Sequence, residues 1–403
     1  MRKLSKIIFV IFGTIYSSVF IIFLLLLGLK RKIFIGYIKT KSIGTLATPM
    51  EIYKYECLEK KVPVDQSTTL WFRSREIANK ILYKKYFHDQ IVLPAYMLKS
   101  VYDFCKKSSY LKKKFIAPYR HVEDYTKKKI LNREQIWQTK DLHDVLVRNK
   151  PYVTFSDREL EIGKNYLLSK KIALDDKIVC FSSRGKKFKN EAYDTIRNGK
   201  IENQIKSVNF LISKNYKALR MGRNEDQKLD IKENDSIIDY AFDEKNSDLL
   251  DLYIFSKCDL LICNGNGINN FATIFRKPKL IVDFTSFSTI NTENDKFLTL
   301  ITPKIYRRKD TKEIVKFSEI FSKDIESIAI TDEISRAGYV ADFNTEDEIL
   351  EATKEILEIK ESADDIEYKE QGDFWKLVNN YSPFAGNFRI SKSFFNKYKE
   401  FFC

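Results

Sequence analysis

Residues 260–275 read LLICNGNGINNFATIF, an apolar run that leads into a glycine turn and then into a second apolar segment. This order predicts a buried strand, a tight turn and a helix. Other apolar runs predict further strands, at residues 177–182, 217–222, 236–241 and 279–284. Apolar residues at helical spacing predict helices, at residues 200–214, 247–256 and 346–359. Strands that alternate with helices in this way indicate an α/β fold whose parallel sheet is covered on both faces.

An earlier part of the chain shows a shorter α/β pattern. Residues 33–38 and 69–72 read as strands, and a helix is expected at 48–59, after a turn of small residues. The polar stretch 106–150 is expected to be rich in loops. A chain of 403 residues is long enough for two domains of ordinary size.

The N-terminal segment, residues 1–32, contains an uncharged run at 7–29. About 20 apolar residues span a bilayer as a helix. Basic residues stand on both sides of the run, and the C-terminal flank is the richer, which favours a cytoplasmic body. We therefore expect a single uncleaved anchor in the inner (plasma) membrane. A cleaved signal peptide and a helix lying flat on the membrane are the alternatives.

The chain carries a net charge of +15, from 70 Lys and Arg residues and 55 Asp and Glu residues. Such a protein suits an anionic partner: nucleic acid, an acidic membrane face or a phosphate-rich substrate. The basic residues are spread along the chain without an arginine-rich arm or an RNA-recognition signature, so no nucleic-acid partner is expected. The six cysteines form no C-x-x-C pair, which fits a reducing compartment.

The residues that follow the predicted strands are candidates for a ligand site, because ligands of open parallel sheets bind beyond the carboxyl ends of the strands. Glycines let the backbone approach a ligand, and a helix start attracts an anion. Arginine forks bind phosphate with two hydrogen bonds. We therefore predict a site for the diphosphate of an activated substrate, called the donor below. It is made of Arg184, Arg220, Gly222, Asn264, Gly265, Asn266 and Gly267. The alternative is a set of solvated arginines and a turn that only joins a strand to a helix.

Other polar residues are candidates for further roles. Arg197 and Asn198 are expected to contact the donor or its sugar, or else to cap a helix. Asp239 or Asp243 is a candidate to orient the base or the ribose. Glu51, on the helix after the first turn, is the candidate base that deprotonates an acceptor hydroxyl. Its alternative role is an exposed carboxylate in a first helical turn.

We expect neither a metal ion nor another cofactor. The three histidines, His88, His121 and His143, show no metal spacing, and no convincing Asp-x-Asp follows a predicted strand. The G-K-[ST], H-E-x-x-H and G-x-S-x-G motifs do not occur in the sequence. Fixed cations and backbone N–H groups stabilise a leaving diphosphate without a metal.

Several sequence blocks occur together in a recognisable order. They are SIGTLA at 42–47 with Glu51 and Tyr53, RN at 197–198 with IEN at 201–203, RMG at 220–222, IDYA at 238–241 and NTE at 344–346. In these blocks the chain resembles a family of glycosyltransferases found with bacterial lipopolysaccharide and capsule genes. The glycine turn at 264–267 also resembles the donor-phosphate turn of heptosyltransferases. The likeness covers nearly all of the chain after the N-terminal segment.

The resemblance implies two facing Rossmann-like domains, a GT-B-like architecture in which the N-terminal domain binds the acceptor and the C-terminal domain the nucleotide-sugar donor. We place these domains at residues 33–165 and 166–360. Residues 361–403 are expected to form a helical segment that packs back on the N-terminal domain. The implied reaction transfers a sugar from a nucleotide-activated donor to a surface-polysaccharide or lipid-linked acceptor.

The chain departs from the family pattern at three positions. Thr45 and Ser182 stand where the family has histidines, and Gly185 stands where it has an aspartate. If either histidine were the base, this chain would lack it, and Thr45 would keep only a contact with the donor or the sugar. Two alternatives therefore stay open. One is a nucleotide-sugar epimerase on the same fold, and the other is an inactive membrane-bound partner that binds a glycan or a sugar nucleotide.

Overall fold

The structure is a computed structural model of the chain. It describes residues 2–27, 32–61, 67–117, 141, 143–185, 194–223, 225, 227–230, 236–285, 287, 298–362, 368–381 and 389–402. The chain divides into two units. Unit 1 comprises Met1–Thr139 and Tyr152–Thr154, and unit 2 comprises Lys140–Pro151 and Phe155–Cys403.

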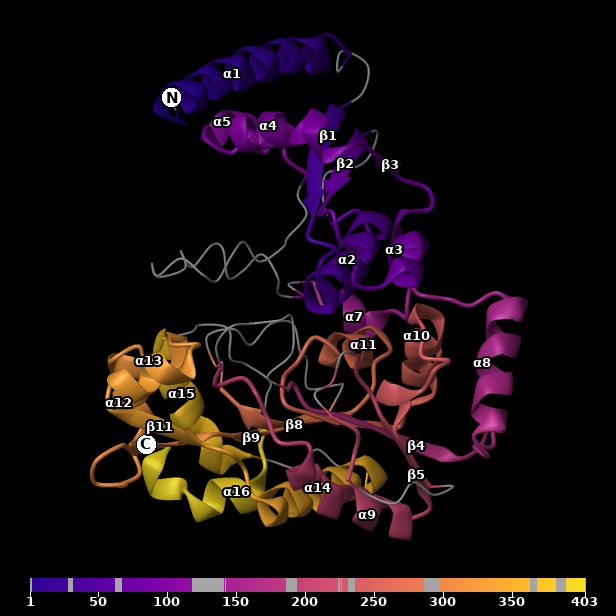
Figure 1. The fold of residues 1–403 in the computed structure, drawn as a ribbon, viewed down its shortest axis with the longest axis vertical. Helices are drawn as coiled ribbons and strands as arrows, with labels where there is room; N and C mark the ends of the chain where they lie inside the picture. Colours follow the sequence, from indigo (N-terminus) through magenta and orange to yellow (C-terminus); the bar gives the residue numbers. More distant parts are fainter. Residues whose placement is uncertain are drawn as a thin grey trace. The chain divides into compact units, whose positions relative to one another are not determined.

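Unit 1 is built on a parallel three-stranded sheet in the order β1-β2-β3 (Figure 1). Its elements are α1 (Arg2–Leu27), β1 (Lys32–Ile38), α2 (Ile43–Leu58), β2 (Ser67–Arg73), α3 (Lys80–Phe87), β3 (Ile91–Val92), α4 (Ala95–Cys105) and α5 (Ser109–Phe115). Gly36 on β1 pairs with Trp71 on β2, and a Cβ at Gly36 would lie 2.3 Å from the Trp71 ring. The glycine therefore lets the buried indole lie flat across the neighbouring strand.

The structure does not support the expectation of a membrane-spanning anchor at the N-terminus. Among the helices in the part of the chain that the structure describes, none has the length and apolar character needed to cross a membrane. One face of α1 instead packs within unit 1, where Ile21 and Leu24 join a buried cluster with Leu98 and Val101 of α4. The Tyr16 hydroxyl also donates a hydrogen bond to the backbone oxygen of Met97, at 2.8 Å.

Unit 2 contains a parallel seven-stranded sheet in the order β12-β9-β8-β7-β4-β5-β6. Its strands are β4 (Lys177–Ser182), β5 (Tyr216–Arg220), β6 (Ile237–Ile238), β7 (Leu260–Cys263), β8 (Lys279–Phe284), β9 (Thr299–Pro303) and β12 (Arg389–Ile390). A separate antiparallel pair is formed by β10 (Ile305–Arg308) and β11 (Tyr339–Asp342). The prediction of an α/β fold with parallel sheets is therefore confirmed.

Helices cover both faces of the large sheet. The helices of unit 2 are α7 (Val145–Arg148), α8 (Asp157–Ser169), α9 (Ile205–Ser213), α10 (Asp248–Lys257), α11 (Asn269–Ile274), α12 (Phe317–Ser322), α13 (Thr331–Arg336), α14 (Glu346–Ser362), α15 (Gly372–Tyr381) and α16 (Lys392–Lys397). Figure 1 shows α9 and α14 on one face and α10 and α11 on the other. Val208 of α9 and Ile349 of α14 pack on Phe181 and Val282 of the sheet, which makes this face the core of unit 2.

The boundary between the units lies earlier in the chain than the predicted residue 165. Helix α8 belongs to unit 2, because Gly163 lies against the ring of Tyr253, where a Cβ would be only 2.2 Å away. Phe155 contacts the same tyrosine and stacks on Phe275, with ring centroids 6.2 Å apart. These aromatic contacts hold residues 155–169 to the large sheet.

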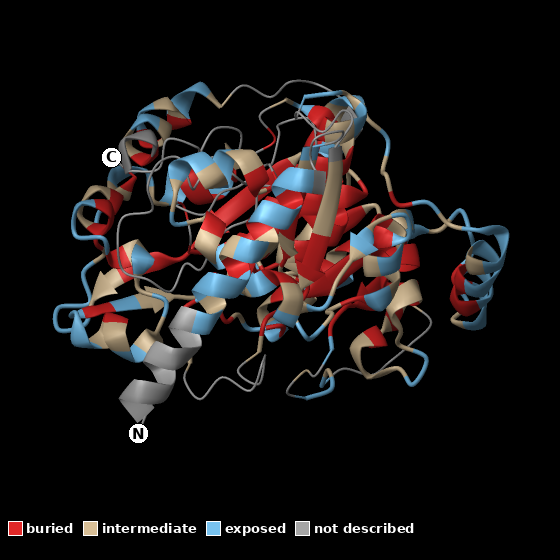
Figure 2. Cartoon of the chain, turned by 90° about the horizontal axis from the view of Figure 1, so that it is seen from above, coloured by how far each residue is buried: buried red, intermediate tan, exposed pale blue. Residues whose placement is uncertain are grey.

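The C-terminal segment also differs from expectation. Its described residues belong to unit 2, not to the N-terminal domain. Strand β12 pairs with β9, and the Phe402 ring stacks on Phe317 and Phe395, both at 5.0 Å between centroids. Figure 2 shows buried residues around the end marked C, as expected for a segment that completes a core. Residues 382–388 of this segment lie outside the described residues.

Candidate functional site

The candidate site lies at the carboxyl edge of the large sheet. Strand β4 pairs with β5 on one side and with β7 on the other, all in parallel. The structure therefore places Arg184, Arg220 and Asn264 at the carboxyl ends of three adjacent strands, at the same edge. The hydrogen bonds at this edge nevertheless separate the predicted residues into two groups.

Asn264 connects three segments of this edge. Its Oδ1 accepts a hydrogen bond from the backbone N–H of Arg184 at 2.9 Å, and its Nδ2 donates to the backbone oxygen of Arg197 at 2.8 Å. The Arg197 guanidinium donates to the backbone oxygen of Gly265 at 3.1 Å. Asn266 Nδ2 donates to Ser182 Oγ at 2.9 Å. The end of β4, the 194–199 loop and the glycine turn are thus held together as one structure.

Two residues that the sequence analysis missed complete this group. Ser183 Oγ is buried and has no hydrogen-bond partner among the described residues. A Cβ at Gly199 would lie 2.6 Å from this hydroxyl and 2.6 Å from Asn264 Nδ2, so only glycine lets the 194–199 loop approach them this closely. A buried hydroxyl without a partner costs about 1–3 kcal/mol, which points to a ligand atom that satisfies it. We call Ser183, Arg184, Arg197, Gly199 and residues 264–267 the cradle.

The helix that follows the glycine turn is shorter than predicted. Helix α11 has six residues, and Gly265 adopts a left-handed backbone with φ of +66°. A helix of this length sums few peptide dipoles, so the expected anion site at its start loses most of its electrostatic support. The cradle depends instead on the arginines, the amide of Asn264 and the hydroxyl of Ser183.

Arg220 does not join the cradle. Its Nη1 donates to Asp239 Oδ2 at 3.2 Å and to the backbone oxygen of Gln227 at 2.8 Å, and its Nη2 lies 3.7 Å from Glu225 Oε2. The residue is only 3% exposed. The prediction that Arg220 binds the donor phosphate is therefore not supported, because carboxylates within the fold already neutralise its charge. Gly222 lies beside the same network, where a Cβ would meet Glu225 at 2.2 Å.

The two candidate aspartates also have structural partners. Asp239 is the buried counter-ion of Arg220 and accepts a further hydrogen bond from the Leu229 N–H at 2.9 Å. Asp243 accepts hydrogen bonds from the hydroxyl of Tyr166, on α8, at 2.9 Å and from Lys170, just after α8, at 2.6 Å. Burial raises the pKa of Asp243, but the hydrogen bonds, led by that from Lys170, outweigh it and hold the pKa below its usual range. Asp243 thus braces α8 against the sheet.

The structure does not support Glu51 as the base. The residue is 0% exposed and lies within unit 1, where it accepts hydrogen bonds from the Tyr86 hydroxyl at 2.9 Å and from the Tyr152 N–H at 2.8 Å. A buried carboxylate with both oxygens engaged is not placed to take a proton from an acceptor. Thr45, near the start of the same helix α2, donates its hydroxyl to the backbone oxygen of Lys39 at 2.7 Å and stabilises the turn.

A buried polar cluster around Lys304 supports the 194–199 loop. Lys304 Nζ donates to the backbone oxygen of Asn198 at 3.0 Å and lies 3.7 Å from the centre of the Phe343 ring. The Asn198 side chain in turn donates to Asp194 Oδ1 at 2.6 Å, so it serves the loop and not a ligand. Burial lowers the pKa of Lys304 to about 8 and raises the pKa of Asp283 to about 6. The cluster positions Arg197 through its neighbour Asn198.

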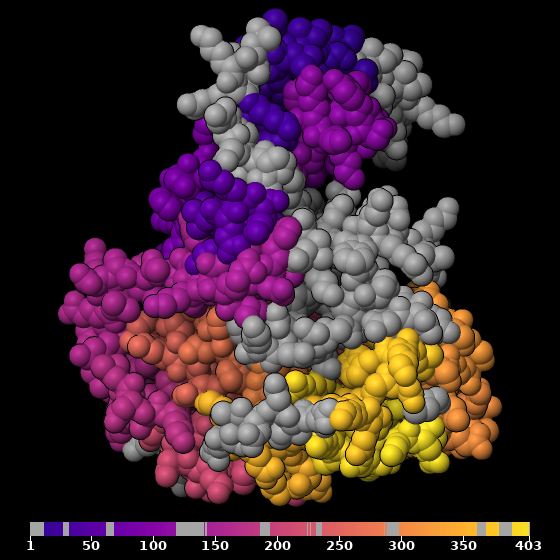
Figure 3. Space-filling view, turned by 180° about the vertical axis from the view of Figure 1, so that it is seen from behind, coloured from indigo at the N-terminus to yellow at the C-terminus, as the bar shows by residue number. Residues whose placement is uncertain are grey.

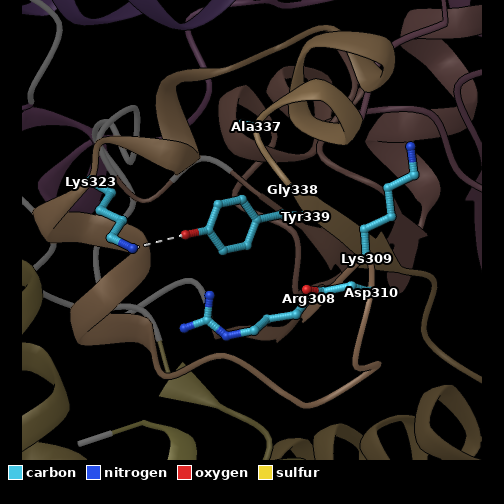
Figure 4. A pocket seen from close by; sticks show the side chains of 7 residues that line it. All are labelled: Arg308, Lys309, Asp310, Lys323, Ala337, Gly338 and Tyr339. Atoms are coloured by element: carbon cyan, nitrogen blue, oxygen red, sulfur yellow. Dashed lines mark hydrogen bonds between the residues drawn. The ribbon is translucent and has the colours of Figure 1, made fainter.

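A second polar feature lies away from the cradle. An open pocket with a volume of about 660 Å³ is lined by Arg308, Lys309, Asp310, Lys323, Ala337, Gly338 and Tyr339 (Figure 4). Glu319 already pairs with two of its cations, at 2.9 Å to Arg308 and 2.8 Å to Lys323. None of the predicted site residues lines it. Within the described ranges, no group of three or more His, Cys, Asp or Glu side chains is placed to hold a metal ion.

Comparisons with known proteins give weak similarities. No protein-family model matches the chain, and no curated protein sequence does. Among solved structures, a family 9 glycosyltransferase from Veillonella parvula is 12% identical, covers 82% of this chain and 98% of its own, and has a TM-score of 0.45. The ADP-heptose lipopolysaccharide heptosyltransferase II of E. coli is 10% identical, with coverages of 62% and 84% and a TM-score of 0.38.

The E. coli heptosyltransferase WaaC, solved with ADP, is 8% identical, with coverages of 66% and 90% and a TM-score of 0.32. At these identities and TM-scores, the similarities establish neither a shared fold nor a shared function. The family resemblance found in the sequence blocks therefore stays a prediction, and the case for a function depends on the cradle.

Proposed function

We propose that this chain is a glycosyltransferase that moves a sugar from a nucleotide-activated donor to a surface-polysaccharide or lipid-linked acceptor. The observation that carries the proposal is the buried hydroxyl of Ser183, which has no partner among the described residues. Arg184 and Arg197 bring two positive charges to the same edge of the sheet. A hydroxyl and two arginines at one edge of a sheet together suit a phosphate group.

The chemistry of sugar transfer explains why such a cradle is useful. The bond between the sugar and the diphosphate breaks, and negative charge grows on the departing nucleoside diphosphate. Donors that are already in place stabilise this charge without reorganisation. The hydrogen bonds of Asn264 to both arginine segments supply this order, because they fix the backbone on both sides of the cradle. We propose that this stabilisation needs no metal.

We also propose a role for each of the two units. Unit 2, with its seven-stranded sheet, binds the donor, and unit 1 binds the acceptor, in the GT-B-like manner that the sequence blocks imply. Nucleotide sugars are made in the cytoplasm, so we place the body of the protein there. Because Glu51 is buried, the proposal no longer assigns it the role of the base.

The first test is nucleotide binding by the purified full chain. A ligand that binds only the folded state at about 100 times its Kd raises the free energy of unfolding by about 2.7 kcal/mol. We expect nucleoside diphosphates to raise the melting temperature and nucleosides to have little effect, because the cradle binds the diphosphate. Transfer is then measured with nucleotide sugars and a lipid-linked glycan acceptor.

Variants of the cradle sharpen this test. Ser183→Ala removes a buried hydroxyl that lacks a partner, so it should stabilise the ligand-free protein by about 1 kcal/mol and weaken diphosphate binding about tenfold. Gly199→Ala would place a Cβ 2.6 Å from the Ser183 hydroxyl and should weaken binding by a similar factor, because the hydroxyl is displaced. Gly372→Ala is the matched control, because a Cβ at Gly372 meets nothing within 4 Å.

The outcomes separate the proposal from its alternatives. Donor turnover that needs no acceptor and returns a nucleotide sugar would identify an epimerase. Binding without any turnover would identify an inactive partner. Diphosphate affinity that is equal in the wild type, Ser183→Ala and Gly199→Ala would show that the cradle is not the donor site.

A further inference from the structure

Helix α1 has two apolar faces, and only one of them is covered in this structure. Ser17, Ile21 and Leu24 are buried toward α4. Six large apolar side chains on the other side are between 51% and 69% exposed: Phe12, Ile15, Val19, Ile22, Phe23 and Leu26. Their spacing of three and four residues gathers them on one stripe of the helix. Figure 2 shows exposed residues along the described part of α1, beyond the end marked N.

An exposed apolar stripe of this kind is expected to bind another surface. Monomeric soluble proteins rarely expose contiguous apolar patches of more than a few hundred Å², and larger ones mark sites of interaction with proteins or membranes. Burial of one face against α4 also fixes the direction of the other, so the stripe is presented outward by a helix that is already anchored in unit 1.

The charge around the stripe indicates which kind of partner binds there. Residues 1–32 contain six basic residues and no acidic one, and residues 95–117, which include α4 and α5, contain six lysines and one aspartate. These two segments account for most of the net charge of +15. Lys107, Lys112 and Lys113 are exposed. Figure 3 shows α1 and the α4–α5 segment side by side on the surface of unit 1.

We propose that α1 lies in the plane of an anionic bilayer surface, with its exposed stripe in the boundary between headgroups and acyl chains and the lysines of α4 and α5 on the lipid phosphates. A basic surface beside an apolar stripe is what binds such membranes. A second copy of the chain is a poorer cover, because it would bring two strongly basic segments together. The proposal does not depend on the donor site, which lies in unit 2.

Vesicle binding by the full chain tests the proposal. Vesicles of phosphatidylcholine alone are compared with vesicles of equal parts phosphatidylcholine and phosphatidylglycerol. We expect at least tenfold tighter binding to the anionic vesicles, and loss of most of this difference in high salt, because salt screens the lysines. The triple variant Lys107→Glu, Lys112→Glu, Lys113→Glu should lose the preference for anionic lipid.

The stripe is tested by the pair Val19→Asp and Phe23→Asp, which places two charges where the acyl chains would be. Binding to anionic vesicles should fall at least tenfold. The matched control is the pair Leu160→Asp and Leu168→Asp, two exposed leucines of α8, which should bind as the wild type does. Urea unfolding of all variants reports whether both units are intact.

Three results would overturn the proposal. The first is equal binding of the α1 pair and the α8 pair to vesicles. The second is vesicle-bound protein that alkaline carbonate cannot release and only detergent extracts, because this would identify a spanning helix. The third is a dimer in the absence of lipid that Val19→Asp and Phe23→Asp dissociate, because a second copy would then cover the stripe.

Discussion

Arg184 and Arg220 lie at the carboxyl ends of neighbouring strands and reach the same edge of the sheet, yet they belong to different hydrogen-bond networks. A buried guanidinium is strongly unfavourable without a counter-charge, and Asp239 supplies that charge to Arg220. The backbone N–H of Arg184 donates to Asn264, next to the buried hydroxyl of Ser183. The position of an arginine after a strand is visible in the sequence. The carboxylate that neutralises it is not, because Asp239 is brought to Arg220 only by the pairing of β5 with β6.

Glu51 gives a prediction that separates a structural role from a catalytic one. Glu51→Ala leaves the Tyr86 hydroxyl and the Tyr152 N–H without their acceptor and should destabilise unit 1 by about 3 kcal/mol. Tyr86→Phe removes one of the two hydrogen bonds and should cost about 1 kcal/mol. Urea unfolding followed by circular dichroism measures both changes. Transfer activity per folded molecule should stay unchanged in both variants.

If Glu51 were the base, the two variants would behave differently. Glu51→Ala would then lower kcat by orders of magnitude at temperatures where the protein is fully folded, and Tyr86→Phe would not. This comparison therefore decides between the role that the sequence predicted and the one that the structure shows.

The elements that the sequence predicted well are those with a strong local signal. Strands β1, β4, β7 and β8 are apolar runs bounded by turns, and all were expected close to their observed bounds. Strand β12 has only two residues and no such signal, because it exists through its pairing with β9. The predicted strand at 236–241 is reduced to Ile237–Ile238 and a 3₁₀ turn, Tyr240–Phe242, for a similar reason.

The candidate site follows the same rule. The glycine turn and Arg184 were predicted because turn residues after an apolar run are local features. Ser183 and Gly199 were missed, although both directly adjoin residues that the sequence singled out. Their importance arises from the 2.6 Å approach across the loop, which no spacing in the sequence reveals.

The C-terminal aromatic cluster allows a prediction at the scale of elements. Phe402 is 0% exposed and packs on Phe317 of α12, Phe374 of α15 and Phe395 of α16. Phe402→Ala should therefore destabilise unit 2 by about 3–5 kcal/mol. Val340→Ala, at a side chain 38% exposed, is the control and should change stability by less than about 1 kcal/mol. Equal urea midpoints for the two variants would contradict the observed packing of the segment.

The molecule as a whole contains a large sheet in unit 2 and a small sheet in unit 1. Unit 2 carries seven parallel strands and the cradle, and unit 1 carries three strands and the apolar stripe of α1. Each unit has its own buried cluster, in which side chains from several elements meet. We infer that the two proposed activities, donor binding and membrane docking, can be disabled separately. A defect in one unit then leaves the other as an internal control.

The pH dependence of stability reports on the cluster beneath the cradle. Burial raises the pKa of Asp283 from 3.8 to about 6 and lowers the pKa of Lys304 from 10.5 to about 8. From about pH 4 to 6 the folded chain therefore holds more protons at Asp283 than the unfolded chain, so stability falls as pH rises. From about pH 8 to 10.5 the unfolded chain holds more protons at Lys304, so stability rises with pH.

Replacement of the buried lysine should remove the second of these effects. Lys304→Met should abolish a rise in the free energy of unfolding of up to about 3 kcal/mol between pH 8 and 10.5, because a shift of one pKa unit corresponds to about 1.36 kcal/mol. Lys309→Met, at an exposed position, is the control and should keep the rise. Urea unfolding at a series of pH values measures the slope. Equal slopes in both variants would mean that Lys304 is not held in a low-dielectric site, and the 194–199 loop would then lack the rigid support that the cradle requires.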